Sequence, residues 1–349
     1  MNIIINGRFL SRQMTGVDRY ASEIIREMDQ LPGASGITLA VAKNRRADLG
    51  LQNIQTVVLG RLTGIPWEQI ALPLYARQKR ARILNLCNMA PLIRPGYVCI
   101  HDMQARANPQ FLNRRFVAYY RFMFAIITRL ARKIITVSEF SKAEIGRFYP
   151  HTLPKVTVIP NSWQHIERVQ ADDTIFTRYP VLAAQPYFFA MSSMSPNKNI
   201  RWIVHTAKRY PQYRFVIAGN VNKRIFSDDP QITEFGDNVL FIGRISDGQA
   251  KALMQKTKAF LFPSYYEGFG LPPIEAMACG ATAVVSNASC LPEIFQKSVH
   301  YIDPRHADTD LDALLLETTD DNRIVLNRFS WKASAQKMMA LITETPQRT

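Results

Sequence analysis

The chain has 349 residues, of which 47% are hydrophobic and 20% charged, and this balance excludes a mainly disordered chain. Its longest apolar runs, such as residues 123–127, are far shorter than the roughly 20 residues that cross a bilayer, so an integral membrane protein is not expected. Residues 1–6 show no charged leader before an apolar core, so no signal peptide is expected. The four cysteines match no zinc spacing and are scattered, which favours a reducing cytosol.

The formal net charge of +15 is distributed unevenly along the chain. Residues 1–160 contain 23 lysines and arginines against 9 acidic residues, a net charge of +14, whereas residues 161–349 have a net charge of +1. A basic half of this kind is typical of a protein that contacts nucleic acid, an anionic membrane surface or an acidic ligand. The charge alone leaves these three classes open.

The first half of the chain alternates short apolar strands with segments of helical length. Strands are predicted at residues 2–6, 37–42, 56–59, 82–86, 97–101, 134–138 and 156–159. Helices are predicted at residues 17–31, 67–80, 109–132 and 140–148. Near-continuous Val, Ile and Leu runs are typical of parallel strands buried on both faces, so this half is predicted to be a doubly wound α/β domain.

Residues 160–186 are polar and irregular, and we interpret them as the connection to a second domain of the same class. Its strands are predicted at residues 187–191, 214–218, 239–242, 259–263, 283–286 and 301–303, and its helices at 200–210, 247–255, 272–279 and 291–295. The prediction is therefore two Rossmann-like domains, residues 1–160 and 161–329, that face each other across a cleft at the carboxyl ends of their strands. A last helix near residues 330–344 is expected to pack back on the first domain, so residues 330–349 are assigned to it.

The segment richest in chemistry runs from Phe262 to Gly280 and reads FPSYYEGFGLPPIEAMACG. A strand is predicted to end at Pro263, a glycine loop follows, and a helix begins near Pro272, because proline suits the first helical turn. Glycines before a helix N-terminus let backbone N–H groups approach an anion closely. Glu267 is then placed in the loop and Glu275 in the first turn of the helix, where the two carboxylates are expected to flank a bound diphosphate. Taken alone, a glutamate pair of this kind is ordinarily a solvated loop carboxylate and a partner of the helix dipole.

This segment closely resembles the signature of the retaining glycosyltransferases of family 4, which have the GT-B fold and carry two glutamates separated by seven residues. The resemblance implies that Glu267 contacts hydroxyls of the donor sugar and that Glu275 contacts the ribose diol of the nucleotide. A carboxylate suits a diol because it accepts two charge-assisted hydrogen bonds. The resemblance also places the donor along the residues between the glutamates, namely Gly268, Phe269, Gly270 and Leu271.

Two further segments of the second half match the same family in the expected order. Residues 192–199, SSMSPNKN, resemble its phosphate-binding turn, which places Lys198 on the diphosphate. Many members carry an arginine early in this turn, where this chain has Ser193. Arg244 ends another predicted strand and is a candidate for contacts with the base or the phosphates.

The first half carries the remaining segments that resemble this family. Residues 6–10 and 15–20 look like its first strand and glycine loop, in which Gly16 admits close approach of the backbone to a ligand. Residues 98–103 resemble its His-Asp strand end, which implies that His101 donates a hydrogen bond to the transferred sugar. Asp102 is then expected to hold the tautomer of His101 or to bind the acceptor. Residues 136–141 and 158–161 also look familial and place Ser138 and Asn161 along the cleft.

The helix predicted over residues 109–134 has a basic side. Arg114, Arg121 and Arg132 share it, because separations of 7 and 11 residues return to nearly the same angle. The opposite, apolar row is formed by Phe116, Tyr120, Met123, Ile127, Leu130 and Ile134. The basic side is either the solvated face of a core helix or a contact with anionic lipid, and the second reading agrees with family members that glycosylate polyprenyl-diphosphate-linked sugars. No helix-turn-helix, RNA-recognition or zinc-finger pattern is present, so nucleic acid is not an expected partner.

The resemblance covers nearly the whole chain and implies a retaining, metal-independent hexosyltransferase with His101, Lys198 and Glu267 at the reaction centre. Fixed positive groups, namely Lys198, Arg244 and the helix N-terminus at residues 270–273, are expected to stabilise the leaving nucleoside diphosphate in place of Mg²⁺, so no cofactor or metal is predicted. The segments look most like bacterial mannosyltransferases of polysaccharide assembly, which favours GDP-mannose over UDP-hexoses or GDP-fucose. The expected acceptor is a glycan or a polyprenyl-diphosphate-linked oligosaccharide at the inner face of the cytoplasmic membrane. A GT-B-fold sugar-nucleotide epimerase and a basic nucleic-acid-binding protein remain the alternatives, and no oligomeric state is predicted.

Overall fold

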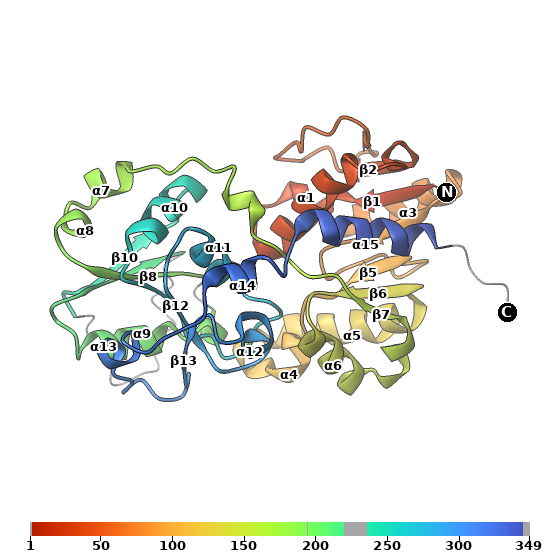
Figure 1. Ribbon diagram of the computed structural model, residues 1–349. Coiled ribbons are helices and arrows are strands. Elements are labelled where there is room, and N and C mark those ends of the chain that lie inside the picture. Colours follow the sequence, from red (N-terminus) through yellow and green to blue (C-terminus); the bar gives the residue numbers. More distant parts are fainter. Residues whose placement is uncertain (1, 194, 220–235, 345–349) are drawn as a thin grey trace. The chain divides into compact units, whose positions relative to one another are not determined.

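The computed structural model describes residues 2–193, 195–219 and 236–344, and its packing divides the chain into two units (Figure 1). The first unit comprises residues 1–161 and 330–349, and the second comprises residues 162–329. Asn161, which the sequence assigned to the second domain, belongs to the first unit. Met194 of the predicted phosphate-binding turn and residues 345–349 of the predicted C-terminal segment lie outside the described residues.

The first unit is built on a seven-stranded parallel sheet with the strand order β3-β2-β1-β4-β5-β6-β7. The strands are β1 (Ile3–Asn6), β2 (Ile37–Val41), β3 (Gln55–Val58), β4 (Arg82–Asn85), β5 (Tyr97–Cys99), β6 (Lys133–Thr136) and β7 (Val156–Val158). In the centre of the sheet, Ile3 of β1 is in register with Ile37 on one side and Arg82 on the other. All four residues of β1 are buried, as expected of a parallel strand that helices cover on both faces. The seven predicted strands are confirmed, with ends shifted by at most two residues.

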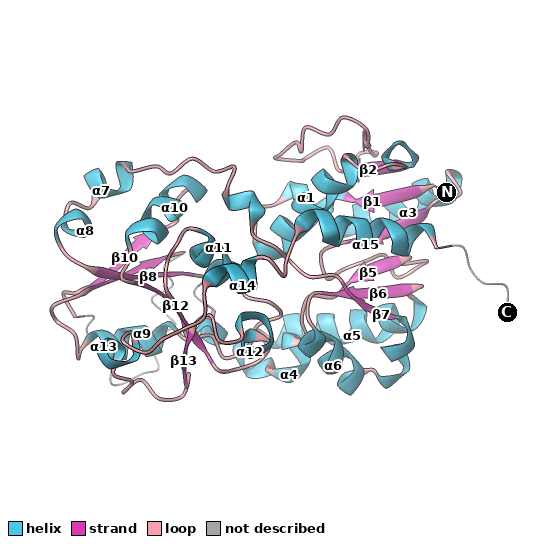
Figure 2. Cartoon of the chain, in the orientation of Figure 1, coloured by secondary structure: helices cyan, strands magenta, loops and turns pink. Residues whose placement is uncertain are grey.

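Helices flank this sheet, as Figure 2 shows. They are the 3₁₀ turn η1 (Gly7–Ser11), α1 (Gly16–Asp29), η2 (Ala34–Gly36), α2 (Gly64–Pro66), the π-helical turn η3 (Trp67–Ala71), α3 (Leu72–Gln78), α4 (Gln104–Ala107), η4 (Pro109–Phe111), α5 (Arg114–Leu130), α6 (Glu139–Phe148), η5 (Pro150–Lys155) and α15 (Trp331–Thr343). The C-terminal helix α15 returns to the first unit, as predicted. The Trp331 ring packs edge-on against Tyr20 of α1, and Ser334 Oγ donates a 2.8 Å hydrogen bond to the Pro160 carbonyl.

The basic helix α5 differs from the prediction in its length and in its buried face. It ends at Leu130, and Arg132 lies beyond it, where its backbone N–H donates to the Gly96 carbonyl. Phe116 and Leu130 of the predicted apolar row are 43% and 56% exposed. The face that packs on the sheet is formed by Val117, Met123, Phe124, Ile127 and Thr128. Because apolar residues occupy most positions of this helix, its sequence does not define which stripe faces the core.

The second unit is built on a six-stranded parallel sheet with the order β10-β9-β8-β11-β12-β13. Its strands are β8 (Tyr187–Met191), β9 (Arg214–Ala218), β10 (Val239–Gly243), β11 (Ala259–Phe262), β12 (Ala283–Ser286) and β13 (His300–Ile302), all of which were predicted. Its helices are η6 (Gln164–Ile166), α7 (Thr174–Arg178), α8 (Val181–Ala184), η7 (Pro196–Lys198), α9 (Ile200–Ala207), α10 (Asp247–Lys256), α11 (Leu271–Ala278), α12 (Leu291–Phe295), α13 (Leu311–Leu314) and α14 (Asn322–Leu326). The segment predicted as irregular therefore contains two short helices, α7 and α8, which the buried side chains of Ile175 and Leu182 anchor.

Candidate active site

Hydrogen bonds that involve two asparagines join the turn after β8 to the loop after β11. Asn199 has a left-handed backbone (φ 54°), and its Nδ2 donates to the carbonyls of Pro263 (3.1 Å) and Pro304 (2.7 Å). The backbone carbonyl of Asn197 accepts from the N–H of Tyr265 at 2.8 Å. Since β8 and β11 are neighbours in the sheet, both segments emerge at the same carboxyl edge. The predicted phosphate-binding turn and glutamate loop are thus one connected structure.

Gly270 ends this loop and caps α11. Its φ of +99° is a left-handed conformation that favours glycine, and a Cβ there would lie 2.9 Å from Leu291 Cδ2. Phe269 is buried and packs edge-on against Phe329 at 5.1 Å, so the loop is fixed from within. Glu267 is held at its backbone, whose N–H donates to Ser289 Oγ at 3.0 Å. The N-terminus of α11, at Leu271, is therefore presented by a rigid loop.

The structure brings Lys198 and Glu267 together as an ion pair. The Lys198 Nζ lies 2.6 Å from Glu267 Oε1 and 5.4 Å from the centroid of the Phe262 ring. The two side chains are only 20% and 12% exposed, so the pair is partly withdrawn from water. A partly buried ammonium at the same sheet edge as a helix N-terminus favours binding of an anion, and the carboxylate paired with it accepts hydrogen bonds from hydroxyl groups.

Glu275 has a partner that the sequence does not indicate. His165 Nε2 lies 2.6 Å from Glu275 Oε1, and since a carboxylate only accepts, the ring donates. The His165 side chain is 2% exposed and the Glu275 side chain is 11% exposed. Because α11 begins at Leu271, Glu275 is in its second turn rather than the first turn that was predicted. No spacing in the sequence signals this contact, which joins residues 110 positions apart.

Ser193 and Arg244 also follow strands of the second sheet at its carboxyl edge. Both residues are exposed. Ser193 follows β8 and Arg244 follows β10, and β9 lies between these two strands in the sheet. Gly243 takes a left-handed φ of 70° immediately before Arg244, so the chain turns at the end of β10. The predicted roles of Ser193 and Arg244 in donor binding remain predictions.

In the first unit, His101 follows β5 and is buried, at 5% exposure. Burial lowers the pKa of His101 to about 4, so its ring is neutral at neutral pH. Its Nε2 lies 2.8 Å from the carbonyl oxygen of Leu86, which accepts only, so Nε2 carries the proton and donates there. In the neutral ring Nδ1 is then an acceptor. The proton on Nε2 is therefore used within the protein, and the expected contact of His101 with the transferred sugar remains a prediction.

The lowered pKa of His101 predicts how stability depends on pH. In the unfolded chain an ordinary histidine takes up a proton near pH 6.5, whereas His101 in the folded chain does so only near pH 4. The unfolded state therefore binds more protons between these values, and the free energy of unfolding falls as the pH is lowered through this window. Urea unfolding at pH 7 and pH 5 should show a smaller loss in His101→Gln, which keeps a donor for Leu86. Equal losses in both proteins would contradict this assignment.

The other predicted residues of the first unit lie at the same carboxyl edge. Asp102 Oδ1 accepts from the N–H of Gln104 at 2.9 Å, and Ser138 caps α6 by accepting from the N–H of Ser141 at 3.0 Å. Gly16 is exposed at the start of α1. Asn161 is 3% exposed, and its Oδ1 has no hydrogen-bond partner among the residues described. Ser138 thus has a structural role as a cap, and Asn161 keeps a buried acceptor available.

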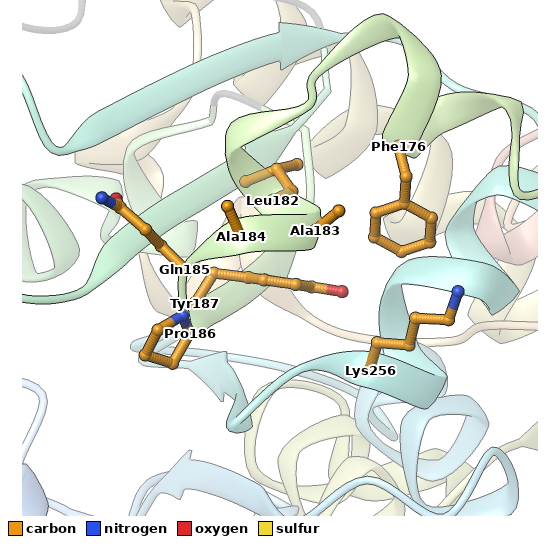
Figure 3. Close-up of a pocket in the computed structure, with 8 residues that line it drawn as sticks. All are labelled: Phe176, Leu182, Ala183, Ala184, Gln185, Pro186, Tyr187 and Lys256. Carbon is orange, nitrogen blue, oxygen red and sulfur yellow. The ribbon is translucent and has the colours of Figure 1, made fainter.

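A surface pocket of about 380 Å³ lies at the opposite, amino edge of the second sheet, where β8 begins (Figure 3). It is lined by Phe176, Leu182, Ala183, Ala184, Gln185, Pro186, Tyr187 and Lys256. The ammonium of Lys256 lies 4.2 Å from the Phe176 ring centroid and 3.1 Å from Asp173. Since ligands of parallel α/β sheets bind at the carboxyl ends of strands, this pocket is not assigned to the donor. Within the described ranges, no group of three His, Cys, Asp or Glu side chains is placed to hold a metal ion.

Comparisons with known proteins agree with this architecture. Two solved structures have a TM-score of 0.72 over 99% of this chain and all of their own: Anabaena Alr3699/HepE in complex with UDP and glucose, at 19% identity, and WaaG, a glycosyltransferase involved in lipopolysaccharide biosynthesis, at 12%. At these identities the likeness concerns the fold alone. It confirms the predicted GT-B class of two Rossmann-like units.

Curated relatives are more similar in sequence. The chain is 30% identical over 234 residues to O-antigen chain mannosyltransferase B of Escherichia coli, a match covering 64% of this chain and 60% of the relative. It is 27% identical over 217 residues to the O-antigen chain mannosyltransferase RfbU of Salmonella typhimurium, covering 61% and 58%. The chain thus spans about three fifths of each of these relatives. Residues 172–345 match the family described as glycosyl transferases group 1, and the chain belongs to this family.

Proposed function

We propose that the protein is a retaining glycosyltransferase that moves a hexose from a nucleotide sugar to a glycan or a polyprenyl-diphosphate-linked oligosaccharide. The observation that carries this proposal is the 2.6 Å contact of Lys198 with Glu267 at the same sheet edge as the N-terminus of α11. The contact pairs a cation, which suits a diphosphate, with a carboxylate, which suits a sugar diol, and the helix N-terminus at the same edge also suits a diphosphate. Family membership and the O-antigen mannosyltransferases among the relatives support the same reading.

Each residue has a distinct part in the proposed reaction. As the bond between the sugar and the nucleoside diphosphate breaks, negative charge develops on the leaving phosphate. Lys198 and the backbone N–H groups at the start of α11 stabilise that charge, and because they are already fixed, little reorganisation is needed. Glu267 orients the sugar through its hydroxyls, and Glu275, held by His165, accepts hydrogen bonds from the ribose. These groups supply positive charge without a metal ion, so the proposed transferase needs no cofactor.

The proposed donor is GDP-mannose. Several curated relatives are named mannosyltransferases, which supports mannose over other hexoses. A panel of GDP- and UDP-sugars, scored for release of the free nucleotide, tests the donor directly. We expect GDP-mannose to be turned over fastest, and turnover to be unchanged in EDTA. Strict dependence on Mn²⁺ or Mg²⁺ would contradict the proposed part of Lys198, and turnover without any acceptor to an epimeric sugar nucleotide would identify an epimerase.

We also propose that the protein works on the inner face of the cytoplasmic membrane, attached peripherally through its first unit. In the described part of the chain, no helix is long and apolar enough to cross a bilayer. The first unit combines the net charge of +14 over residues 1–160 with most of the exposed large hydrophobic side chains. On α5, Phe122 is 58% exposed between Arg115 and Arg129, which are also exposed and each lie seven residues from it. Such a mixed basic and aromatic face favours anionic lipid.

A test of membrane binding should target this face and not the basic side that was predicted from the sequence. Arg132 lies outside α5, and Arg121 is partly buried, so Arg114, Arg121 and Arg132 do not form a common face. The triple change Arg115→Glu, Phe122→Ser, Arg129→Glu should lower binding to anionic vesicles at least about tenfold, since each basic residue contributes roughly 1 kcal/mol near the surface. Vesicle sedimentation at low and high salt measures it.

The matched control reverses charge elsewhere in the same unit. Lys332 and Lys337 are exposed on α15, and Lys332→Glu/Lys337→Glu changes the net charge as much as the two arginine reversals. We expect this control to retain most of the vesicle binding. Equal losses in both variants would mean that net charge alone, rather than the α5 face, attracts the protein to lipid, and an intact wild-type protein that ignores anionic vesicles would refute attachment.

A further inference from the structure

Two arginines follow β1 on a turn whose position is fixed. Arg8 lies within the 3₁₀ turn η1, and Arg12 caps its C-terminal end. Gly7 begins this turn, and a Cβ at Gly7 would collide with the carbonyl oxygen of Ala40 in β2, so the turn packs directly on the sheet. The two guanidinium groups therefore project from a rigid element at the carboxyl edge of the first sheet.

A buried carboxylate holds each guanidinium from one side. Arg8 Nη1 is paired with Glu68 Oε2, while the other oxygen of Glu68 accepts from Asn6 Nδ2 at 2.8 Å. Arg12 donates through Nε (3.0 Å) and Nη2 (2.6 Å) to Asp18 Oδ1, and Asp18 Oδ2 accepts from the hydroxyl of Thr15 at 2.7 Å. The carboxylates are only 3% and 2% exposed, whereas the arginine side chains are 26% and 48% exposed. The acids thus orient the arginines, and the positive groups stay accessible.

Aromatic side chains of α5 form a wall, and the hydroxyl of Tyr120 in it is within electrostatic range of the two arginines. Tyr120 of α5 stacks on Phe116 with ring centroids 4.2 Å apart, and Phe116 is 43% exposed. Burial raises the pKa of Tyr120 to about 12, and the charges of Arg12 and Arg8 act on the same hydroxyl in the opposite direction. Arg8 also acts on Tyr119. The charges of the two guanidiniums therefore reach the hydroxyl end of this Phe116–Tyr120 wall within the first unit.

We propose that Arg8 and Arg12, with the Phe116–Tyr120 wall, bind an oxyanion carried by the acceptor, either a diphosphate or a sugar carboxylate. The planar fork of a guanidinium matches both groups bidentately, and aromatic faces pack against the apolar faces of sugars. Stability alone is a weak reason for this arrangement, because ion pairs that bury a carboxylate repay little of its desolvation. The inference rests on the proposed transferase function, since it assigns the site to the acceptor rather than to the donor.

The test uses the full chain with two soluble probes, inorganic pyrophosphate and glucuronate. Calorimetric titrations are carried out with saturating GDP, so that the candidate donor site of the second unit is occupied. We expect one further site for pyrophosphate or for glucuronate, and the probe that binds shows whether the acceptor presents a diphosphate or a carboxylate. Arg8→Gln/Arg12→Gln should weaken that binding at least about tenfold, because charge-assisted hydrogen bonds are lost. Arg8→Lys/Arg12→Lys keeps a positive charge for both ion pairs and removes only the bidentate guanidinium. It therefore tests the role of the guanidinium even where the glutamine variant fails to fold.

Arg26 provides the matched control. It is 39% exposed and paired at 2.8 Å with Glu23, which is 1% exposed, on the same helix as Asp18. Arg26→Gln should leave probe binding unchanged. The inference is overturned if neither probe binds, if Arg26→Gln weakens binding as much, or if the Arg8 and Arg12 variants weaken GDP binding instead. A wild-type protein that binds no nucleoside diphosphate would refute the proposed function itself, which keeps the two failures separate.

Discussion

Replacing Lys198 by methionine is expected to lower kcat by about 10²- to 10³-fold, the loss typical of removing one fixed group that stabilises transition-state charge. Lys198 is held by its contact with Glu267 and lies over the Phe262 ring, so its ammonium is in position before the phosphate leaves. Methionine keeps an unbranched side chain of similar length and removes the charge together with its hydrogen-bond donors. Release of nucleoside diphosphate at saturating donor measures the effect.

Lys258 is a matched control in the same unit. Its ammonium also combines a carboxylate and an aromatic ring, at 3.5 Å from Asp312 Oδ1 and 5.0 Å from the Tyr213 centroid. It precedes β11, at the amino edge of the sheet, so Lys258→Met should keep the wild-type kcat. Similar losses in both variants would show that lysine removal disturbs folding and not the reaction.

A double variant distinguishes the effect of losing the Lys198 ammonium from the effect of leaving the Glu267 carboxylate without its ion-pair partner. Without the ammonium, the Glu267 carboxylate is left close to the phosphates, where like charges repel. Lys198→Met should therefore also raise the KM for the donor, and Lys198→Met/Glu267→Gln should recover part of that KM but not kcat. If kcat is unaffected by Lys198→Met, the assignment of Lys198 to the leaving phosphate is wrong.

The strands of both sheets could be predicted because parallel strands buried on two faces are continuous apolar runs, and such runs differ sharply from the surrounding sequence. The helices are less well specified. In α5, apolar residues occupy most positions, so its exposed stripe became visible only in the structure. The short helices α7 and α8 have no side-chain caps, and their buried residues Ile175 and Leu182 sit in an otherwise polar segment.

In the candidate site, too, some residues could be predicted from the sequence and others could not. Lys198 and Glu267 could be proposed because each belongs to a local segment with a recognisable form, and the sheet brings neighbouring strand ends together. His165 could not be proposed, because its importance comes from a single contact with a residue 110 positions away. The tautomer of His101 was likewise out of reach, since it depends on the carbonyl of Leu86, which presents no sequence signal.

Replacing Glu275 by alanine should weaken nucleotide binding and leave turnover nearly unchanged. A contact with the ribose is the same in the ground state and the transition state, so it contributes to affinity without lowering the barrier. Loss of a hydrogen bond to a charged group costs roughly 1.5–3 kcal/mol, which corresponds to a GDP affinity lowered about 10- to 150-fold. Titration with GDP and steady-state kinetics on the same variant measure both quantities.

A ligand without the ribose diol tells recognition from a general disturbance of α11. Wild-type protein should bind 2′,3′-dideoxy-GDP less tightly than GDP, and Glu275→Ala should lose that preference because no carboxylate remains to read the diol. His165→Ala should lose part of it, since Glu275 Oε1 would no longer be oriented by a donor at 2.6 Å, and His165→Gln should restore it where the amide reaches the same oxygen. A Glu275→Ala protein that still prefers GDP as strongly as the wild type would show that the ribose is bound elsewhere.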